Sequence, residues 1–197
     1  MIHNDPVGWP GLLALGIGGL VFAAALILAQ RRRRGEVARA AVRSRRSLVG
    51  IGIQMLGILL VGLGPMRLVL SPGSPAALVQ AGVVTALMAG VVALFWTATR
   101  AMGRNWSLVA RTRADHELVE TGPFAHIRHP IYTALALFVL ALATAYGHVS
   151  HLWVAGPLYM LGTWFRVTEE ERLLRSMFGA RYDDYARRVR RFVPGLF

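Results

Sequence analysis

The fold of this chain depends on a polar, turn-forming segment that leads directly into an apolar run: Gly122-Pro123-Phe124-Ala125-His126-Ile127-Arg128-His129-Pro130-Ile131-Tyr132. The apolar run continues to Tyr146 and is long enough to enter a membrane. Ionisable side chains at a membrane boundary are costly to desolvate and mark a functional site by default. We therefore expect a site here, with Arg166 and the glutamates at 169–171 as the partners of this segment.

The composition indicates an integral membrane protein. Hydrophobic residues make up 55% of the 197 positions, whereas soluble domains contain roughly 45–50%. Cysteine is absent, which excludes disulfides, thiolate metal ligands and a cysteine nucleophile.

The charge of the chain is strongly basic, but its distribution does not favour nucleic acid. All 22 basic residues are arginine, and the net charge is +12. The arginines lie in blocks that flank the apolar segments, which is typical of a topology signal, so no nucleic-acid partner is expected. The block from Arg31 to Arg46 is suited to binding anionic lipid head groups.

Five apolar runs are expected to span the membrane as helices. They cover about residues 8–29, 48–70, 76–99, 130–146 and 152–165. The second and third runs are expected to form a helical hairpin, and the fifth to continue as one helix to Phe178, with Gly179 as its stop. The first run has no basic leader and no cleavage signature, so it is interpreted as a retained span and not as a signal peptide.

These runs predict an all-α, polytopic integral membrane protein with a single domain over residues 1–197. Residues 1–99 would hold three spans and the basic connector 31–46, and residues 100–197 would form a cofactor-binding core. The positive-inside rule then places the N-terminus outside and the C-terminus, with the cofactor site, in the cytoplasm. The arginine-, alanine- and glycine-rich composition suggests a bacterial inner-membrane protein.

Proline at 130 predicts the start of a helix with His129 at its cap. The free N–H groups of that helix start, together with Arg128, could cradle an anion. The alternative is that Arg128 and His129 only mark the membrane interface. His126 and His129 are three residues apart, but the flanking prolines make the segment a loop, so no metal site is expected.

The charged run after the fifth apolar segment is helical in character. Glu170 lies four residues after Arg166 and therefore shares its helix face, whereas Glu169 and Glu171 lie to either side. The alternative is an ordinary exposed ion pair.

Residues near the C-terminus form an amphipathic helical pattern. Tyr182, Tyr185, Val189 and Phe192 fall on one stripe, and arginines occupy the opposite face. This helix is expected to cover the cytoplasmic end of the bundle or to lie on the membrane surface. A catalytic tyrosine here is the less favoured interpretation.

In this order, the motifs resemble the isoprenylcysteine carboxyl methyltransferase family and related phospholipid methyltransferase-like membrane enzymes. The matching residues are Leu118-Val119-Glu120-Thr121-Gly122-Pro123-Phe124, Arg128-His129-Pro130-Ile131-Tyr132, Glu169-Glu170, Phe178-Gly179, Tyr182, Tyr185 and Pro194. The resemblance covers residues 100–197 and implies that the chain uses S-adenosylmethionine, with S-adenosylhomocysteine as its product.

The resemblance also implies roles for individual residues. The cofactor would be held by His116, Glu117, Leu118, Val119, Phe124, His129, Pro130, Ile131, Tyr132 and Glu170. The catalytic residues would be Arg166, Glu170 and His129. Phe124 stands where the family usually has tyrosine, which retains the ring and removes a hydroxyl.

Arg166 matches an arginine that is implicated in placing the methyl acceptor. A carboxylate acceptor needs no general base and can be held by a bidentate arginine. An amine or hydroxyl acceptor would need a base, for which His129 or Glu169 is the candidate. We favour a small lipophilic acceptor, because prenylated proteins are not expected in a bacterial source.

Two other functions remain open from the sequence. One is an NADPH-dependent membrane reductase of the sterol-reductase type, whose C-terminal region looks similar. The other is a non-enzymatic membrane protein that binds anionic lipid through Arg31 to Arg46. Measuring the binding of S-adenosylmethionine and of NADPH distinguishes both of these functions from a methyltransferase.

Overall fold

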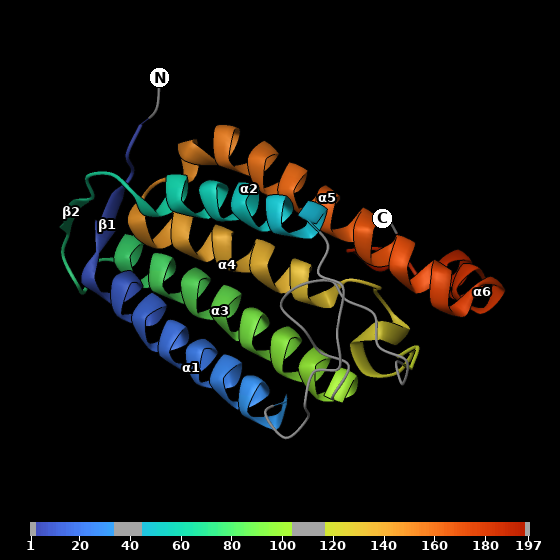
Figure 1. The fold of residues 1–197 in the computed structure, drawn as a ribbon. Helices are drawn as coiled ribbons and strands as arrows, with labels where there is room; N and C mark the ends of the chain where they lie inside the picture. The colour runs from blue at the N-terminus through green and yellow to red at the C-terminus, as the bar shows by residue number, and fades with distance from the viewer. Residues whose placement is uncertain (1–2, 34–44, 104–116, 196–197) are drawn as a thin grey trace.

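The computed structural model describes residues 3–33, 45–103 and 117–195, and it is mostly helical. Long helices lie side by side in one bundle, with α5 extending beyond its neighbours to α6 (Figure 1). The elements are β1 (Pro6–Gly8), α1 (Trp9–Arg33), α2 (Arg45–Gly62), β2 (Arg67–Leu70), α3 (Pro75–Met102), α4 (Pro130–Tyr146), α5 (Leu152–Phe178) and α6 (Ala180–Arg188), with short 3₁₀ turns at Gly122–Ala125 and Val149–His151.

The helices pack in an order that differs from their order in the chain. α3 lies between α1 and α4, and α2 packs along α5. The expected hairpin of the second and third apolar runs is therefore wrong. The second run packs against α5 instead, because Gly50 of α2 and Gly162 of α5 have no side chains and let the two backbones approach closely.

The second apolar run is also shorter than expected, because α2 ends at Gly62. Gly64 follows with a φ of 128°, a conformation that favours glycine. Residues Arg67–Leu70 then form β2, which pairs in parallel with β1. The mostly helical fold agrees with the expected class, and this small sheet is a feature that the sequence analysis did not predict, in which the exposed backbone after Gly64 finds hydrogen-bond partners near the N-terminus.

Other helix boundaries follow the local signals in the sequence. α4 begins at Pro130 with His129 at its cap, as predicted. α5 runs unbroken from Leu152 to Phe178 and ends at Gly179, which has a φ of 52°. Both predictions are confirmed.

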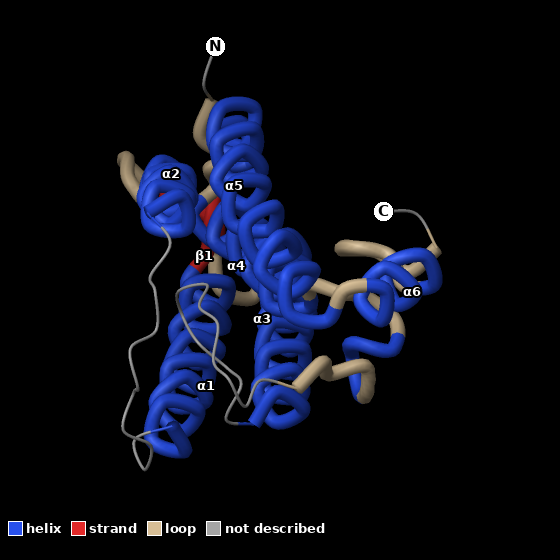
Figure 2. The backbone as a smooth tube through the Cα atoms, turned by 45° about the vertical axis from the view of Figure 1, so that its right-hand side comes forward, coloured by secondary structure: helices blue, strands red, loops and turns tan. Residues whose placement is uncertain are grey.

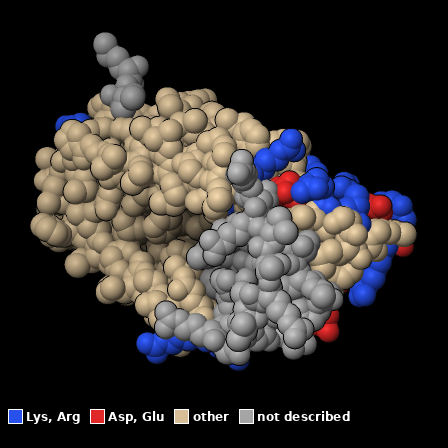
Figure 3. Space-filling model, viewed as in Figure 1, with Lys and Arg blue, Asp and Glu red and all other residues tan. Residues whose placement is uncertain are grey.

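Two helices, α1 and α3, are long and apolar enough to cross a membrane by length and composition. α2 and α4 are shorter apolar helices. Large apolar side chains such as Leu13, Ile17 and Leu20 on α1 are exposed, and a surface of that kind favours an apolar environment. The charged side chains visible in Figure 3 gather mainly at the α6 end, away from the broad uncharged face of the bundle.

We expect Gly162→Ala to destabilise the protein, because a Cβ at Gly162 would lie 2.6 Å from the backbone N of Gln54 and 2.7 Å from the backbone O of Gly50. Overpacking of this kind costs roughly 1–3 kcal/mol. Thermal unfolding of the detergent-solubilised protein should show a lower midpoint. Gly156→Ala is the matched control on the same helix, since nothing lies within 4 Å of its added Cβ. Equal midpoints for the two variants would contradict the close α2–α5 contact.

Candidate functional site

A buried carboxylate, that of Glu171 on α5, lies at the centre of the charged end of the bundle. Only 2% of Glu171 is exposed. Arg191 donates to it through two nitrogens, Nε to Oε1 at 2.9 Å and Nη2 to Oε2 at 2.8 Å. Arg128 Nη2 and His129 Nε2 each lie 3.2 Å from Oε1. The carboxylate thus joins three segments that are distant in the sequence.

Backbone hydrogen bonds hold two of those segments together. The N–H groups of Arg128 and His129 donate to the carbonyl oxygens of Arg190 and Arg191, at 2.7 and 2.9 Å. Ile127 also forms a parallel bridge with Arg190. The residues after α6 therefore run beside the loop that leads into α4, on one side of the bundle (Figure 2).

The surroundings of Glu171 hold the pKa of its carboxyl well below the usual value. Burial alone would raise this pKa, but hydrogen bonds from His129 and Arg191 and the charge of Arg128 outweigh the burial. The group therefore stays ionised at neutral pH and keeps its cationic partners in place.

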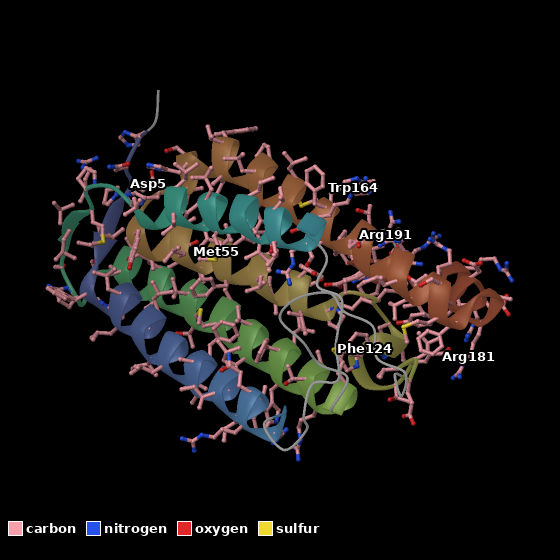
Figure 4. All side chains as sticks on the ribbon, in the orientation of Figure 1. Asp5, Met55, Phe124, Trp164, Arg181 and Arg191 are labelled. Carbon is pink, nitrogen blue, oxygen red and sulfur yellow. The ribbon has the colours of Figure 1, made fainter. Side chains whose placement is uncertain are left out.

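A pocket lies beside this network, between the loop before α4 and the segment from α5 to α6. It is partly open, and the empty space in and in front of it, solvent included, is about 410 Å³. Its lining residues are Met102, Glu117, Leu118, Val119, Phe124, Arg128, His129, Leu174, Tyr182 and Tyr185. Figure 4 shows Phe124 at this end of the molecule, with Asp5 at the other end. The pocket combines apolar walls with a smaller number of polar groups, as ligand sites usually do.

A second polar group lies between α2, α4 and α5. The Tyr132 hydroxyl donates to Glu170 Oε1, and the Arg166 guanidinium lies 4.8 Å from the centre of the Tyr132 ring. Arg166 Nη1 donates to Gln54 Oε1 at 2.8 Å. Gln54 is 2% exposed, so α2 contributes a buried side chain to this group.

His129 lies between the pocket and the second polar group. Its Nε2 faces Glu171, and its Nδ1 lies 3.7 Å from Glu170 Oε2. The ring is 5% exposed and also lines the pocket. A single imidazole thus contacts both halves of the candidate site.

The structure brings together most of the residues that the sequence singles out, in two places. Glu117, Leu118, Val119, Phe124 and His129 line the pocket. The group around Arg166 contains Tyr132 and Glu170.

The other predicted site residues lie elsewhere. Pro130 is buried at the start of α4, and Ile131 packs against the apolar cluster of Ala25, Ala29, Phe95 and Ala134. Neither of the two lines the pocket as described. His116 lies outside the described residues, as does most of the connector 31–46.

The two histidines of the quoted segment lie in different environments, because His126 is exposed and His129 is buried against carboxylates. Within residues 3–33, 45–103 and 117–195 no group of three or more side chains could hold a metal ion.

The sequence analysis named Glu171 only as one of three glutamates facing the 122–132 segment, and it did not identify Arg191, Tyr182 and Tyr185 as site residues. A signal for Glu171 was present, because Val167, Glu171, Leu174 and Phe178 recur at helical spacing. A charge inside an otherwise apolar stripe predicts a buried, paired carboxylate. The interaction of Glu171 with Arg191 is a contact across 20 positions that no local pattern specifies.

The fold and the site define a helical protein with apolar candidate spans and a pocket at its charged end. The sequence profile of the phospholipid methyltransferase family matches residues 79–181, which is more than half of the chain. The chain therefore belongs to the phospholipid methyltransferase family.

Curated proteins each match about half of the chain. A protein-S-isoprenylcysteine O-methyltransferase of Schizosaccharomyces pombe is 31% identical over 98 residues, which are 47% of this chain and 40% of the relative. A protein of the same name from Tribolium castaneum is 32% identical over 104 residues, 50% of this chain and 36% of the relative. A nickel-cobalt-cadmium resistance protein of Alcaligenes xylosoxydans xylosoxydans is 31% identical over 96 residues, 48% of this chain and 45% of the relative.

The chain thus matches less than half the length of each of these relatives. The resemblance to the isoprenylcysteine carboxyl methyltransferase family is confirmed by the family match and by the two methyltransferase relatives.

We expect Glu171→Gln to destabilise the protein strongly at neutral pH, because the change leaves buried cationic partners without their counter-charge. Removing one member of a buried ionic network costs roughly 3–5 kcal/mol. The folded carboxyl has a lowered pKa, so its contribution is complete above the usual carboxyl pKa and is lost as the pH falls toward the folded value.

Thermal midpoints of the wild type and of Glu171→Gln should therefore differ by a constant amount between about pH 5 and pH 8 and converge at more acid pH. Asp183→Asn is the control, since Asp183 pairs with Arg175 at an exposed position and should change the midpoint little. A difference that grows on acidification would contradict the ionised state of Glu171.

Proposed function

We propose that this chain is an integral membrane methyltransferase that moves a methyl group from S-adenosylmethionine to a lipophilic carboxylate at the cytoplasmic face. The observation that carries the proposal is the pocket joined through His129 to the Arg166 group. Family membership supports the reaction class. The names of the two isoprenylcysteine O-methyltransferase relatives support a lipidated acceptor.

The residues around the pocket fit such a methyl donor. Leu118, Val119 and Phe124 offer apolar walls for the adenosyl part. Two buried polar atoms in the lining, Arg128 Nε and Tyr182 Oη, have no hydrogen-bond partner in the part of the chain that the structure describes. A ligand with an apolar body and a charged end would satisfy both features.

Bound S-adenosylmethionine supplies a methyl group that its sulfonium already activates. The task of the chain is then to bind and align the reactants and to exclude water, which is positioning catalysis. Arg166 is suited to hold a carboxylate, because Gln54 and the Tyr132 ring fix its guanidinium on one side. Glu170, bonded to Tyr132, would keep the start of α4 in place beside the donor.

An amine or hydroxyl acceptor would instead need a base near Arg166. Glu169 is already engaged by Arg172, whose Nη2 lies 2.8 Å from Glu169 Oε1. His129 is better suited, because its ring lines the pocket and reaches Glu170. With a carboxylate acceptor His129 would act only in binding, and with an amine or hydroxyl acceptor it would also act as the base.

Two tryptophans support a membrane boundary at this end of the bundle. Arg32 and Arg100 lie 4.9 and 5.3 Å from the ring centre of Trp96, and Arg191 lies 5.3 Å from that of Trp164. Figure 4 labels Trp164 and Arg191, which lie near each other beside α5. Tryptophan is enriched at both membrane interfaces, and arginine is enriched on the cytoplasmic side.

We extend the proposal to a single membrane domain of five spans, with the N-terminus outside and the polar end, including the pocket, in the cytoplasm. A polar donor would then enter from the cytoplasm and a lipophilic acceptor from the bilayer. A soluble acid that is methylated better than a lipophilic one would contradict this split access.

We expect Arg166→Ala to retain binding of S-adenosylhomocysteine and to lose methyl transfer by at least about a hundredfold, because Arg166 lies in the acceptor group and not in the pocket lining. Glu170→Ala is expected to weaken that binding although Glu170 is also outside the lining, because its carboxylate faces His129 of the lining and accepts from Tyr132 at the start of α4. Calorimetric titration measures the binding, and methylation of an S-isoprenylated cysteine derivative measures the transfer. Arg172→Ala, at an exposed position on the same helix, is the control and should change neither.

The same titration separates the alternatives. Binding of NADPH in place of S-adenosylhomocysteine would favour the reductase. Binding of neither, with retained affinity for anionic vesicles, would favour the lipid-binding protein. Phosphatidylethanolamine as the best acceptor would keep the methyltransferase and move the acceptor from a carboxylate to an amine.

A further inference from the structure

Two hydrogen-bond donors in the wall of the pocket are buried without a hydrogen-bond partner among the described residues. Tyr182 is fully buried, and its hydroxyl makes no hydrogen bond. The Nε of Arg128 is likewise buried and unbonded. Both side chains line the same pocket. Buried polar groups without partners are rare in proteins and destabilise the fold, so a pair of them in one pocket requires a cause.

The neighbouring polar groups of the same wall are all bonded. The Tyr185 hydroxyl donates to the carbonyl oxygen of Phe124 at 2.7 Å. The other Arg128 nitrogens are engaged as well, since Nη1 donates to the Ala186 carbonyl at 2.9 Å and Nη2 lies 3.2 Å from Glu171. The unbonded state is therefore specific to the Tyr182 hydroxyl and to one edge of Arg128.

The side chain of Tyr182 is held firmly in this position. Its ring packs with Leu118, Tyr185 and Val189 in a small apolar cluster. The Arg175 guanidinium lies 5.3 Å from the ring centre. Because the ring is held from both sides, the side chain cannot move its hydroxyl toward water or another residue without disrupting the cluster.

Both unbonded groups are hydrogen-bond donors at neutral pH. Burial raises the pKa of Tyr182, so the hydroxyl keeps its proton. Arginine has only donors and is always charged. Two donors, one of them cationic, match the acceptor oxygens of a carboxylate. The amino-acid end of the methyl donor carries such a carboxylate, and its adenosyl part suits the apolar walls.

We propose that the Tyr182 hydroxyl and the Arg128 Nε form the subsite that binds the amino-acid carboxylate of the methyl donor. This inference rests on the proposed function and assigns a recognition role to α6, which the sequence analysis treated as a cover or a surface helix. Tyr182 is a binding residue in this account and takes no part in bond making.

The test is calorimetric titration of the full-length wild type and of Tyr182→Phe with two ligands. One ligand is S-adenosylhomocysteine, and the other is its decarboxylated analogue, which keeps the amine and lacks the carboxylate. Tyr182→Phe should weaken binding of S-adenosylhomocysteine about tenfold and leave binding of the analogue unchanged. The ratio of the affinities for S-adenosylhomocysteine and for the analogue should therefore fall by the same factor in Tyr182→Phe.

Tyr185→Phe is the matched control, and thermal unfolding without ligand is the second measurement. Tyr182→Phe removes an unbonded hydroxyl and should keep or raise the unfolding midpoint, whereas Tyr185→Phe removes a bonded one and should lower it.

If the wild type binds S-adenosylhomocysteine and Tyr182→Phe binds it equally well, the carboxylate subsite is wrong and the proposed function stands. The same holds if the variant loses affinity for both ligands alike. A wild type that binds neither ligand overturns the subsite together with the proposed function.

Discussion

The ion-pair network of Glu171 determines how the candidate site is assembled. One carboxylate on α5 faces Arg128, His129 and Arg191, which come from the loop before α4 and from the segment after α6. Burying these charges is costly and is compensated only when every partner is in place. Because the partners come from separate segments, the carboxylate couples the end of α5, the entry to α4 and the C-terminal residues. The pocket lies where these segments meet, so its shape depends on the same network.

The network also explains why the site has two halves. His129 is fixed by Glu171 on one side and reaches Glu170 on the other, so it separates the pocket from the group around Arg166. The Arg166 group includes Gln54 from α2, and Gln54 also donates to Thr163 of α5 at 2.7 Å. The N-terminal half of the chain therefore contributes a buried polar side chain to the acceptor side. The close approach of α2 and α5 at Gly162 is what allows Gln54 to reach that far.

The sequence predicted those features that depend on neighbouring residues. Pro130 marks the start of α4, and Gly179, with its positive φ, marks the end of α5, because each acts through local backbone geometry. The pairing of α2 with α5 depends on small residues that meet across more than a hundred positions, so the expected hairpin failed. The β1–β2 sheet and the Glu171–Arg191 pair were missed for the same reason. Motif resemblance identified residues on both sides of His129, but it did not divide them between the pocket and the Arg166 group.

The residue at position 124 determines which side chains of the pocket lining can form hydrogen bonds. Where the resembling family usually has tyrosine, this chain has phenylalanine, whose ring lines the pocket without offering a hydroxyl. The backbone of Phe124 still serves the fold, because its carbonyl accepts the Tyr185 hydroxyl. The polar part of the lining is therefore left to Glu117, Arg128, His129 and the tyrosines of α6. Of the two tyrosines, Tyr185 is committed to the backbone and Tyr182 is not. In this chain, α6 thus both closes the pocket with an apolar stripe and supplies the one tyrosine hydroxyl of the described lining that the protein itself does not use.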